Sequence, residues 1–316
     1  MNHQHEEKIW GCLLHLSFNM WEEYISPHRT FRGFRPDLEL DEPLWHEAVQ
    51  AMAKNGGNLI VIDLGDAVKY ESHPEIAVRG AWSPKKLREE LKRMRDAGIE
   101  PIPKLNFSAG HNTWMREYAR MVSTDVYYEV CTHLIDEVCD LFDKPRLFHL
   151  GMDEEGFGHQ SHHRHIIIRK NEVWWGDFYH LVAQVERNGS RAWIWPDYML
   201  WNHPEQFFKK MPKSVVQSNW YYDTFDDVDK KYIQAYIELN RAGYDQIPTG
   251  AYLVGKWFGT KSPELNIGGT ADFCKKNLDD KLLLGFLQSW WGPTIEENRD
   301  RIMGGIRLLG EAKKKY

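Results

Sequence analysis

The stretch that decides the fold is Phe148-His149-Leu150-Gly151-Met152-Asp153-Glu154-Glu155, an apolar run that stops in three consecutive carboxylates. A strand that buries the apolar residues would present Asp153 and Glu154 at its carboxyl end. In parallel α/β proteins the ligand crevice lies at the carboxyl ends of the strands. The pattern therefore predicts a buried parallel strand with an acidic site at its tip. The alternative is that the two carboxylates only cap a following helix.

Around this stretch, short apolar runs alternate with longer amphipathic ones, which is typical of repeated βα units. The predicted strands are 10–18, 58–64, 100–105, 146–150, 192–195, 214–218, 246–250 and 282–288. The predicted helices lie near 43–54, 84–97, 123–141, 171–187, 203–210, 226–242, 269–279 and 294–309. Eight strands alternating with eight helices predict a single-domain (β/α)8 TIM barrel over residues 1–316.

The first connection of this barrel is unusually long. Residues 19–40 are polar and aromatic and show no period, so we expect a long βα loop over the barrel mouth. An open doubly wound sheet is the alternative fold. It lacks support in its dinucleotide-binding form, because no Gly-rich phosphate loop follows the first strand. No cofactor is therefore expected.

Composition limits the class of partner. The net charge is −6 with Lys and Arg scattered along the chain, which argues against a nucleic-acid partner or a membrane surface. Aromatic residues make up 13% and include 14 Trp, more than a core of this size requires. Trp at strand ends suits a cleft that stacks sugars, although ordinary core packing accounts for part of them. An oligosaccharide or glycoconjugate substrate fits best, and the oligomeric state stays open.

The early apolar run 9–18 contains His15 and follows Glu6-Glu7-Lys8, which makes it a poor signal peptide or membrane span and a good first strand. The chain as given predicts a cytoplasmic protein. An extracytoplasmic location would follow if an export signal had been removed.

The pattern His149-x-Gly-Met-Asp153-Glu154 resembles the catalytic signature of glycoside hydrolase family 20, the β-N-acetylhexosaminidases. Residues 58–66 resemble the family's second strand, with Asp63 in place of a His, and 82–106 resemble its second helix and third strand. Ser108-Ala109-Gly110-His111 stands where the family has Pro-Gly-His. The likeness is specific from 58 to 155 and weaker through Trp195, Trp220, Tyr252 and Trp291. Glu155 departs from the family, which usually has an aliphatic residue there.

Cleaving a glycosidic bond near neutral pH requires a protonated carboxyl group for the leaving oxygen and a second group under the developing positive charge. We expect Glu154 to be the acid, with its pKa raised by burial and by the charge of Asp153, which stays ionised. The resemblance implies that Asp153 orients the substrate's own 2-acetamido group as nucleophile. It also implies that Asp66 and His111 form a hydrogen-bonded chain to Glu154, and that Tyr252 holds the acetamido oxygen. Without a function, His111 would be a loop histidine, Asp66 a turn residue and Tyr252 a rim aromatic.

For substrate binding, we predict that at least two of four tryptophans, Trp195, Trp220, Trp290 and Trp291, form an apolar wall for a pyranose ring. Asn19, after the first strand, is placed among the substrate-binding residues. Two departures from the family concern hydroxyl recognition. The first strand offers no Arg until Arg29, and Trp291 is followed by Gly292-Pro293 instead of a Glu two residues on.

Three function classes follow. The first is a retaining, substrate-assisted hydrolase of N-acetylated amino sugars. The second is a carbohydrate-binding barrel without turnover, and the third is a hydrolase of non-acetylated glycans that uses Asp153 or Glu155 as nucleophile. A metal site among four histidines is disfavoured, because their spacing fits no compact tetrahedral motif: His159, His162, His163 and His165.

Overall fold

The computed structural model describes residues 7–25, 32–161, 163–202, 204–254, 260 and 262–316. Segment 26–31 of the expected long loop, which contains Arg29, lies outside these residues, and so does His162.

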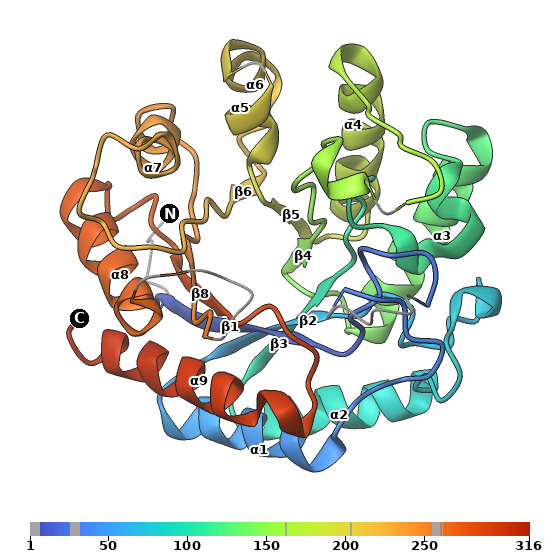
Figure 1. The fold of residues 1–316 in the computed structure, drawn as a ribbon, viewed down its shortest axis with the longest axis horizontal. Coiled ribbons are helices and arrows are strands. Elements are labelled where there is room, and N and C mark those ends of the chain that lie inside the picture. The colour runs from blue at the N-terminus through green and yellow to red at the C-terminus, as the bar shows by residue number, and fades with distance from the viewer. Residues whose placement is uncertain (1–6, 26–31, 162, 203, 255–259, 261) are drawn as a thin grey trace.

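Eight parallel strands form one sheet in the order β6-β5-β4-β3-β2-β1-β8-β7, which confirms the predicted (β/α)8 barrel (Figure 1). Isolated parallel bridges, Gln217 to Gln246 and Trp220 to Thr249, bring the two end strands together. The strands are β1 (Ile9–His15), β2 (Leu59–Asp63), β3 (Glu100–Lys104), β4 (Leu147–His149), β5 (Arg191–Ile194), β6 (Val216–Gln217), β7 (Thr249–Ala251) and β8 (Gly285–Ser289).

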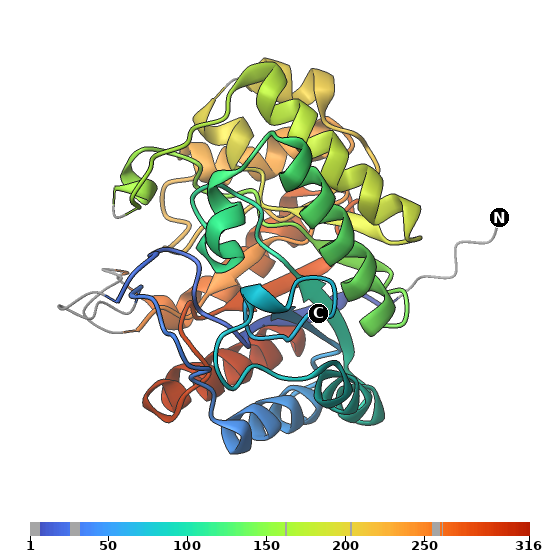
Figure 2. The same cartoon turned by 90° about the vertical axis from the view of Figure 1, so that its right-hand side faces the viewer.

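The helices lie around the outside of the strands, as Figures 1 and 2 show from two directions. They are α1 (Glu42–Lys54), α2 (Pro84–Asp96), α3 (Asp125–Leu141), α4 (Asn171–Arg187), α5 (Asp197–Trp201), α6 (Pro204–Lys210), α7 (Lys231–Arg241), α8 (Asn266–Asn277) and α9 (Arg299–Lys313). Sequence analysis missed α5, whose single turn is too short to show a period. Among the described residues, no helix is both long enough and apolar enough to cross a membrane.

The junction between β3 and β4 is the sparsest in the sheet. Leu59 to Asp63 pair with Glu100 to Lys104 in register, but β3 pairs with β4 only at Lys104 and His149. The Glu100 N–H donates to the carbonyl of Asn58, just before β2, and the Leu105 N–H donates to the carbonyl of His149 in β4. The alternate residues Pro101 and Pro103 therefore face β4. Proline has no N–H to donate, and the ladder on this side is therefore reduced.

Two apolar cores result from the alternation of side chains along the strands. One lies between the barrel and its helices and contains most of the buried aromatic residues. The other fills the barrel itself with residues that include Leu13, Val61, Ile102, Leu147 and Trp193. The interior of the barrel is thus a packed core.

A buried ion pair closes the top of the inner core. Lys104 Nζ donates to Asp63 Oδ2, and His15 Nδ1 lies 3.4 Å from the same oxygen. Burial alone would raise the pKa of Asp63, but Lys104 and His15 outweigh it and hold that pKa below its usual value. Both charges of the pair are fully shielded from water, so each depends on the other.

This dependence predicts the effect of removing one partner. Lys104→Met should leave the Asp63 charge buried without compensation and lower the free energy of unfolding by about 3–5 kcal/mol. The double variant Lys104→Met/Asp63→Asn removes both charges and should recover much of the loss. Urea unfolding of the wild type, both single variants and the double variant measures this. A single variant as stable as the wild type would contradict the account.

Candidate active site

The tip of β4 is held in an unusual backbone shape. Gly151, Met152 and Glu154 have φ values of 74°, 74° and 52°, in the left-handed region that non-glycine residues rarely adopt. A Cβ on Gly151 would lie 2.0 Å from Asn106 Oδ1, so only glycine fits there. Asn106 Nδ2 in turn donates to Asp153 Oδ1 at 2.8 Å. Gly151 therefore leaves room for the Asn106 side chain, and the Asn106 amide group holds Asp153 in place.

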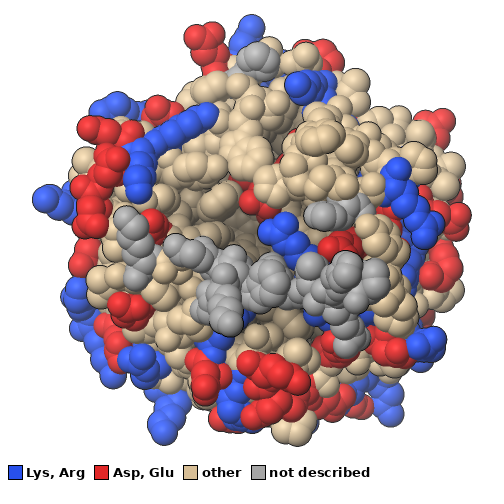
Figure 3. All heavy atoms as spheres, in the orientation of Figure 1, with Lys and Arg blue, Asp and Glu red and all other residues tan. Residues whose placement is uncertain are grey.

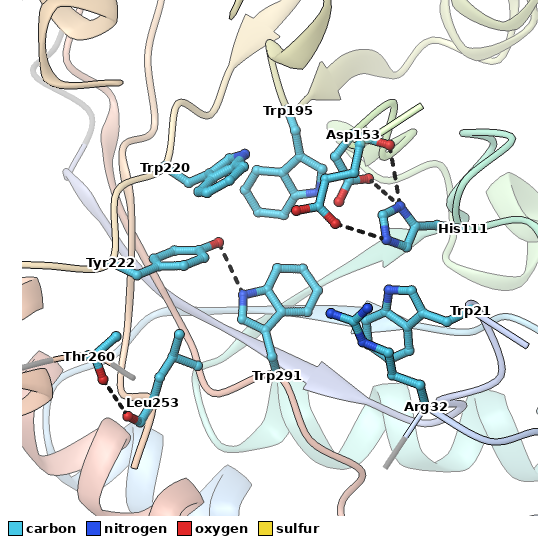
Figure 4. A pocket seen from close by; sticks show the side chains of 11 residues that line it. Trp21, Arg32, His111, Asp153, Trp195, Trp220, Tyr222, Leu253, Thr260 and Trp291 are labelled. Carbon is cyan, nitrogen blue, oxygen red and sulfur yellow. Dashed lines mark hydrogen bonds and ion pairs between the residues drawn. The ribbon is translucent and has the colours of Figure 1, made fainter. Parts of the chain in front are cut away.

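His111 lies between the two carboxylates. Its Nδ1 is 3.4 Å from Asp153 Oδ1, and its Nε2 is 3.4 Å from Glu154 Oε2 (Figure 4). Burial alone would lower the pKa of His111, but the charges and hydrogen bonds of Asp153 and Glu154 outweigh it and raise the pKa to about 10. The imidazole is therefore a cation at neutral pH, with one carboxylate at each nitrogen.

The same contacts correct the expected state of Glu154. Burial favours its protonated form, but hydrogen bonds from His111 and from His159, 3.3 Å away, outweigh burial and hold the pKa of Glu154 below its usual value. The prediction of a raised pKa was wrong because it considered only burial and the charge of Asp153, and not the two histidines. At neutral pH the proton among these three groups therefore resides on His111.

These groups line a cavity of about 280 Å³ at the barrel mouth. The space-filling view shows a hollow near the middle of this face, with red carboxylate and blue Lys or Arg atoms at its rim (Figure 3). Three of the predicted tryptophans, Trp195, Trp220 and Trp291, form its aromatic wall (Figure 4). The remaining lining is His111, Asp153, Glu154, Trp21, Arg32, Tyr222, Leu253 and Thr260.

Comparison with protein-family models and with curated protein sequences found no match. Solved structures do match. The β-N-acetylhexosaminidase from Bacteroides fragilis NCTC 9343 has a TM-score of 0.66 at 14% identity, over 98% of this chain and 65% of that one. The fold is that of a family 20 hexosaminidase barrel.

Two Streptomyces enzymes match this chain with similar TM-scores. The family 20 β-N-acetylhexosaminidase from Streptomyces coelicolor A3(2) has a TM-score of 0.66 at 14% identity, over 97% of this chain and 64% of that one. The Streptomyces plicatus N-acetyl-β-hexosaminidase, in complex with Thio-NAglucal, has a TM-score of 0.65 at 15% identity. The match covers 97% of this chain and 63% of that one. The present chain spans less than two-thirds of the length of these proteins.

Two aromatic residues predicted to bind substrate lie outside the cavity. Tyr252 packs on α9, where a Cβ on Gly304 would come within 2.6 Å of its ring. Trp290 is fully buried in the outer core. The two adjacent indoles diverge just after β8, where Trp291 leaves the extended conformation with a φ of 41°. Trp291 lines the cavity, and its neighbour packs among the outer-core residues.

The cavity tyrosine is Tyr222, which the sequence analysis missed. Its hydroxyl accepts a hydrogen bond of 3.0 Å from Trp291 Nε1, which leaves the hydroxyl proton available as a donor. The signal was present in Trp220-Tyr221-Tyr222, where residues two apart share a side. Trp21 was also missed, although it lies in the predicted mouth loop.

Asp66 and Asn19 form a separate buried unit. Asp66 accepts from Ser17 Oγ at 2.7 Å and from Asn19 Nδ2 at 3.0 Å, and in the part of the chain that the structure describes it has no contact with His111. Asn19 is also bonded to the backbone of Arg35. The predicted chain from Asp66 through His111 to Glu154 is therefore wrong in its first link. Burial outweighs these hydrogen bonds and raises the pKa of Asp66 to about 6.

Glu155 faces away from the cavity. Arg169 donates to both of its carboxylate oxygens, through Nε at 2.8 Å and Nη2 at 2.6 Å, and its Nη1 donates to Asp177 at 2.9 Å. Arg169 is almost fully buried, so this network ties the β4 tip to α4. The role of nucleophile considered for Glu155 does not fit this position.

Asp197, which sequence analysis missed, hydrogen-bonds to two parts of the site. Its Oδ1 accepts from Trp220 Nε1 at 2.8 Å, and its Oδ2 accepts from the Glu154 backbone N–H at 3.2 Å. Burial, together with the charges of Asp153 and Glu154, holds the pKa of Asp197 well above its usual value. One carboxyl group thus positions both an indole of the aromatic wall and the backbone of Glu154.

Three potential metal-ligand atoms, from His111, Asp153 and Glu154, lie within 4.8 Å of one another. Ion pairing accounts for this spacing, because the His111 proton already neutralises one carboxylate. The loop histidines diverge: His159 contacts Glu154, His163 Nε2 bonds to the Trp21 carbonyl at 2.6 Å, and His165 is exposed.

The raised pKa of His111 predicts how stability depends on pH. A group whose pKa is higher in the folded state stabilises the protein fully below the unfolded value of 6.5 and loses this effect as pH rises through about 10. Between these values the His111 contribution should fall by at most about 1.4 kcal/mol per pH unit.

His111→Asn should abolish this slope, whereas His165→Asn, at an exposed position, should keep it. Urea unfolding at pH 6, 8 and 10 measures the difference. A wild-type stability that stays level across this range would contradict a charged His111.

Proposed function

We propose that this protein is a retaining glycoside hydrolase that cleaves N-acetylated amino sugars with the help of the substrate's own acetamido group. The observation that carries the proposal is the pair Asp153 and Glu154, bridged by His111 in an indole-walled cavity. The fold likeness to hexosaminidases supports it, and the Streptomyces plicatus enzyme is described in complex with the product GlcNAc.

The cavity limits what enters the site. About 280 Å³ takes one pyranose ring, so the enzyme would act on a terminal sugar. Trp195, Trp220 and Trp291 offer apolar faces to the ring and to an acetamido methyl group. The Tyr222 hydroxyl can donate to the acetamido oxygen, which is the role that sequence analysis gave to Tyr252.

Glu154 would act as the acid through its contact with His111. When the sugar displaces water, separated charges become less favourable, and transfer of the His111 proton to Glu154 neutralises both groups. The resulting carboxylic acid protonates the leaving oxygen as the glycosidic bond breaks. The Glu154 carboxylate then serves as base for the incoming water.

Asp153 would act on the other side of the reaction. Asn106 and His111 orient its carboxylate, which can accept the acetamido N–H and direct the carbonyl oxygen at the anomeric carbon. Its negative charge also stabilises the developing oxocarbenium ion. Attack by the substrate followed by attack of water gives overall retention, and no enzyme nucleophile is needed.

The two carboxylates should respond differently to substitution. Glu154→Gln keeps the shape and removes the acid, so turnover of alkyl glycosides should fall by ~10²-fold or more, while activated aryl glycosides lose much less. Asp153→Asn should impair both substrate types, because the carboxylate assists the attacking acetamido group and the cationic centre whichever leaving group departs. A panel of 2-acetamido and 2-hydroxy glycosides with aryl and methyl leaving groups measures this.

Glu155→Gln is the matched control. It weakens the Arg169 network and should lower stability without any dependence on the leaving group. A leaving-group effect in Glu155→Gln but not in Glu154→Gln would move the acid to position 155. If the wild type binds sugars but cleaves none of the panel, the protein is a carbohydrate-binding barrel.

A further inference from the structure

We propose that Trp201, together with His159, forms a second subsite that binds the sugar ring of the leaving group. This inference rests on the proposed function for its orientation, because the acid marks the side on which the leaving group lies. Its ligand class is the neutral pyranose ring of an oligosaccharide or glycoconjugate, attached to the terminal sugar that fills the cavity.

The first support is the position of Trp201 relative to the acid. His159 Nε2 lies 3.3 Å from Glu154 Oε2, and the rings of His159 and Trp201 are 5.1 Å apart between centroids. A Cβ on Gly156 would lie 3.6 Å from the Trp201 ring, which places the indole against the loop that follows Glu154. The Trp201 ring is therefore separated from the acid by one imidazole.

The second support is continuity with the aromatic wall of the cavity. Tyr222 stacks on Trp220 at 5.0 Å, and Trp220 lies 5.1 Å from the Tyr232 ring. The Tyr232 hydroxyl accepts a hydrogen bond of 3.0 Å from Trp201 Nε1. The aromatic row thus begins inside the cavity and ends in Trp201 outside it, on the side of Glu154.

The third support is the exposure of this indole. Trp201 is 41% exposed, whereas Trp195 at the centre of the site is 1% exposed. Its ring is nevertheless held by Tyr232 and His159, so it presents a fixed apolar face to solvent at little cost in conformational entropy on binding. Because the cavity takes one ring, a second ring linked through the scissile oxygen must lie outside it, next to Glu154.

The test compares two substrates that share one terminal sugar and differ in the second ring. They are N,N′-diacetylchitobiose and methyl N-acetyl-β-D-glucosaminide, both of which have poor alkoxide leaving groups. Trp201→Ala should lower kcat/KM for the disaccharide ~10-fold more than for the methyl glycoside, mainly through KM. Trp201→Phe keeps a stacking face and should restore most of the difference. Tyr179→Ala, at an exposed tyrosine of α4 with 40% exposure, is the matched control and should affect neither substrate.

Equal losses on both substrates would show that Trp201 only supports the fold and would overturn the subsite. Binding in the Glu154→Gln background separates this inference from the proposed function. Calorimetry there should show that the disaccharide binds more tightly than N-acetylglucosamine and that Trp201→Ala removes the difference. If the wild type cleaves no glycoside but this difference is present, the hydrolase proposal fails and the subsite stands. A disaccharide that binds no more tightly than the monosaccharide, or no binding of either sugar, would overturn it.

Discussion

The site depends on one buried cation between two carboxylates. Without the His111 proton, Asp153 and Glu154 would be adjacent like charges at the end of a buried strand, and one of them would have to be neutral. With it, both can be ionised, and the proton that the proposed mechanism requires lies on His111, whose Nε2 is 3.4 Å from Glu154 Oε2. The surrounding structure serves this arrangement. Asn106 fixes one carboxylate, Asp197 holds the backbone of the other, and the left-handed turn at Gly151 brings the pair into the mouth of the barrel.

Strands and helices could be read from the sequence because each buries a periodic apolar face, and the alternation of 3.6-residue and two-residue periods is a local property. The carboxylate pair could be placed at a strand end for the same reason. These features depend on neighbours in the chain, which is why pattern alone was sufficient for them.

The remaining features depend on distances between segments. Tyr252 directly follows β7, whereas Tyr222 comes five residues after β6, and the sequence does not indicate which of the two side chains enters the cavity. The charge state of Glu154 depends on histidines 43 residues before it and five after it. Glu155 looked like a third catalytic candidate until Arg169 was found against it, and Asp66 resembled a relay residue until Ser17 and Asn19 were found to bind it. No spacing rule contains this information.

The sparse pairing between β3 and β4 has a consequence for how such a site can evolve. His111 follows one of these strands and Asp153 the other, yet two prolines prevent most of the backbone ladder that would normally align them. Two backbone bonds, from Leu105 to His149 and from Phe107 to Leu150, remain. Side chains supply the rest of the alignment, through Asn106 with Asp153, Ser108 with the Asp153 carbonyl and Arg169 with the Phe107 carbonyl. A few substitutions could therefore alter the relative placement of the catalytic groups while the rest of the sheet keeps its pairing. Strand pairing and the geometry of the site therefore depend on different residues. A chain that has diverged this far in sequence can keep the barrel fold while the arrangement of its site residues changes.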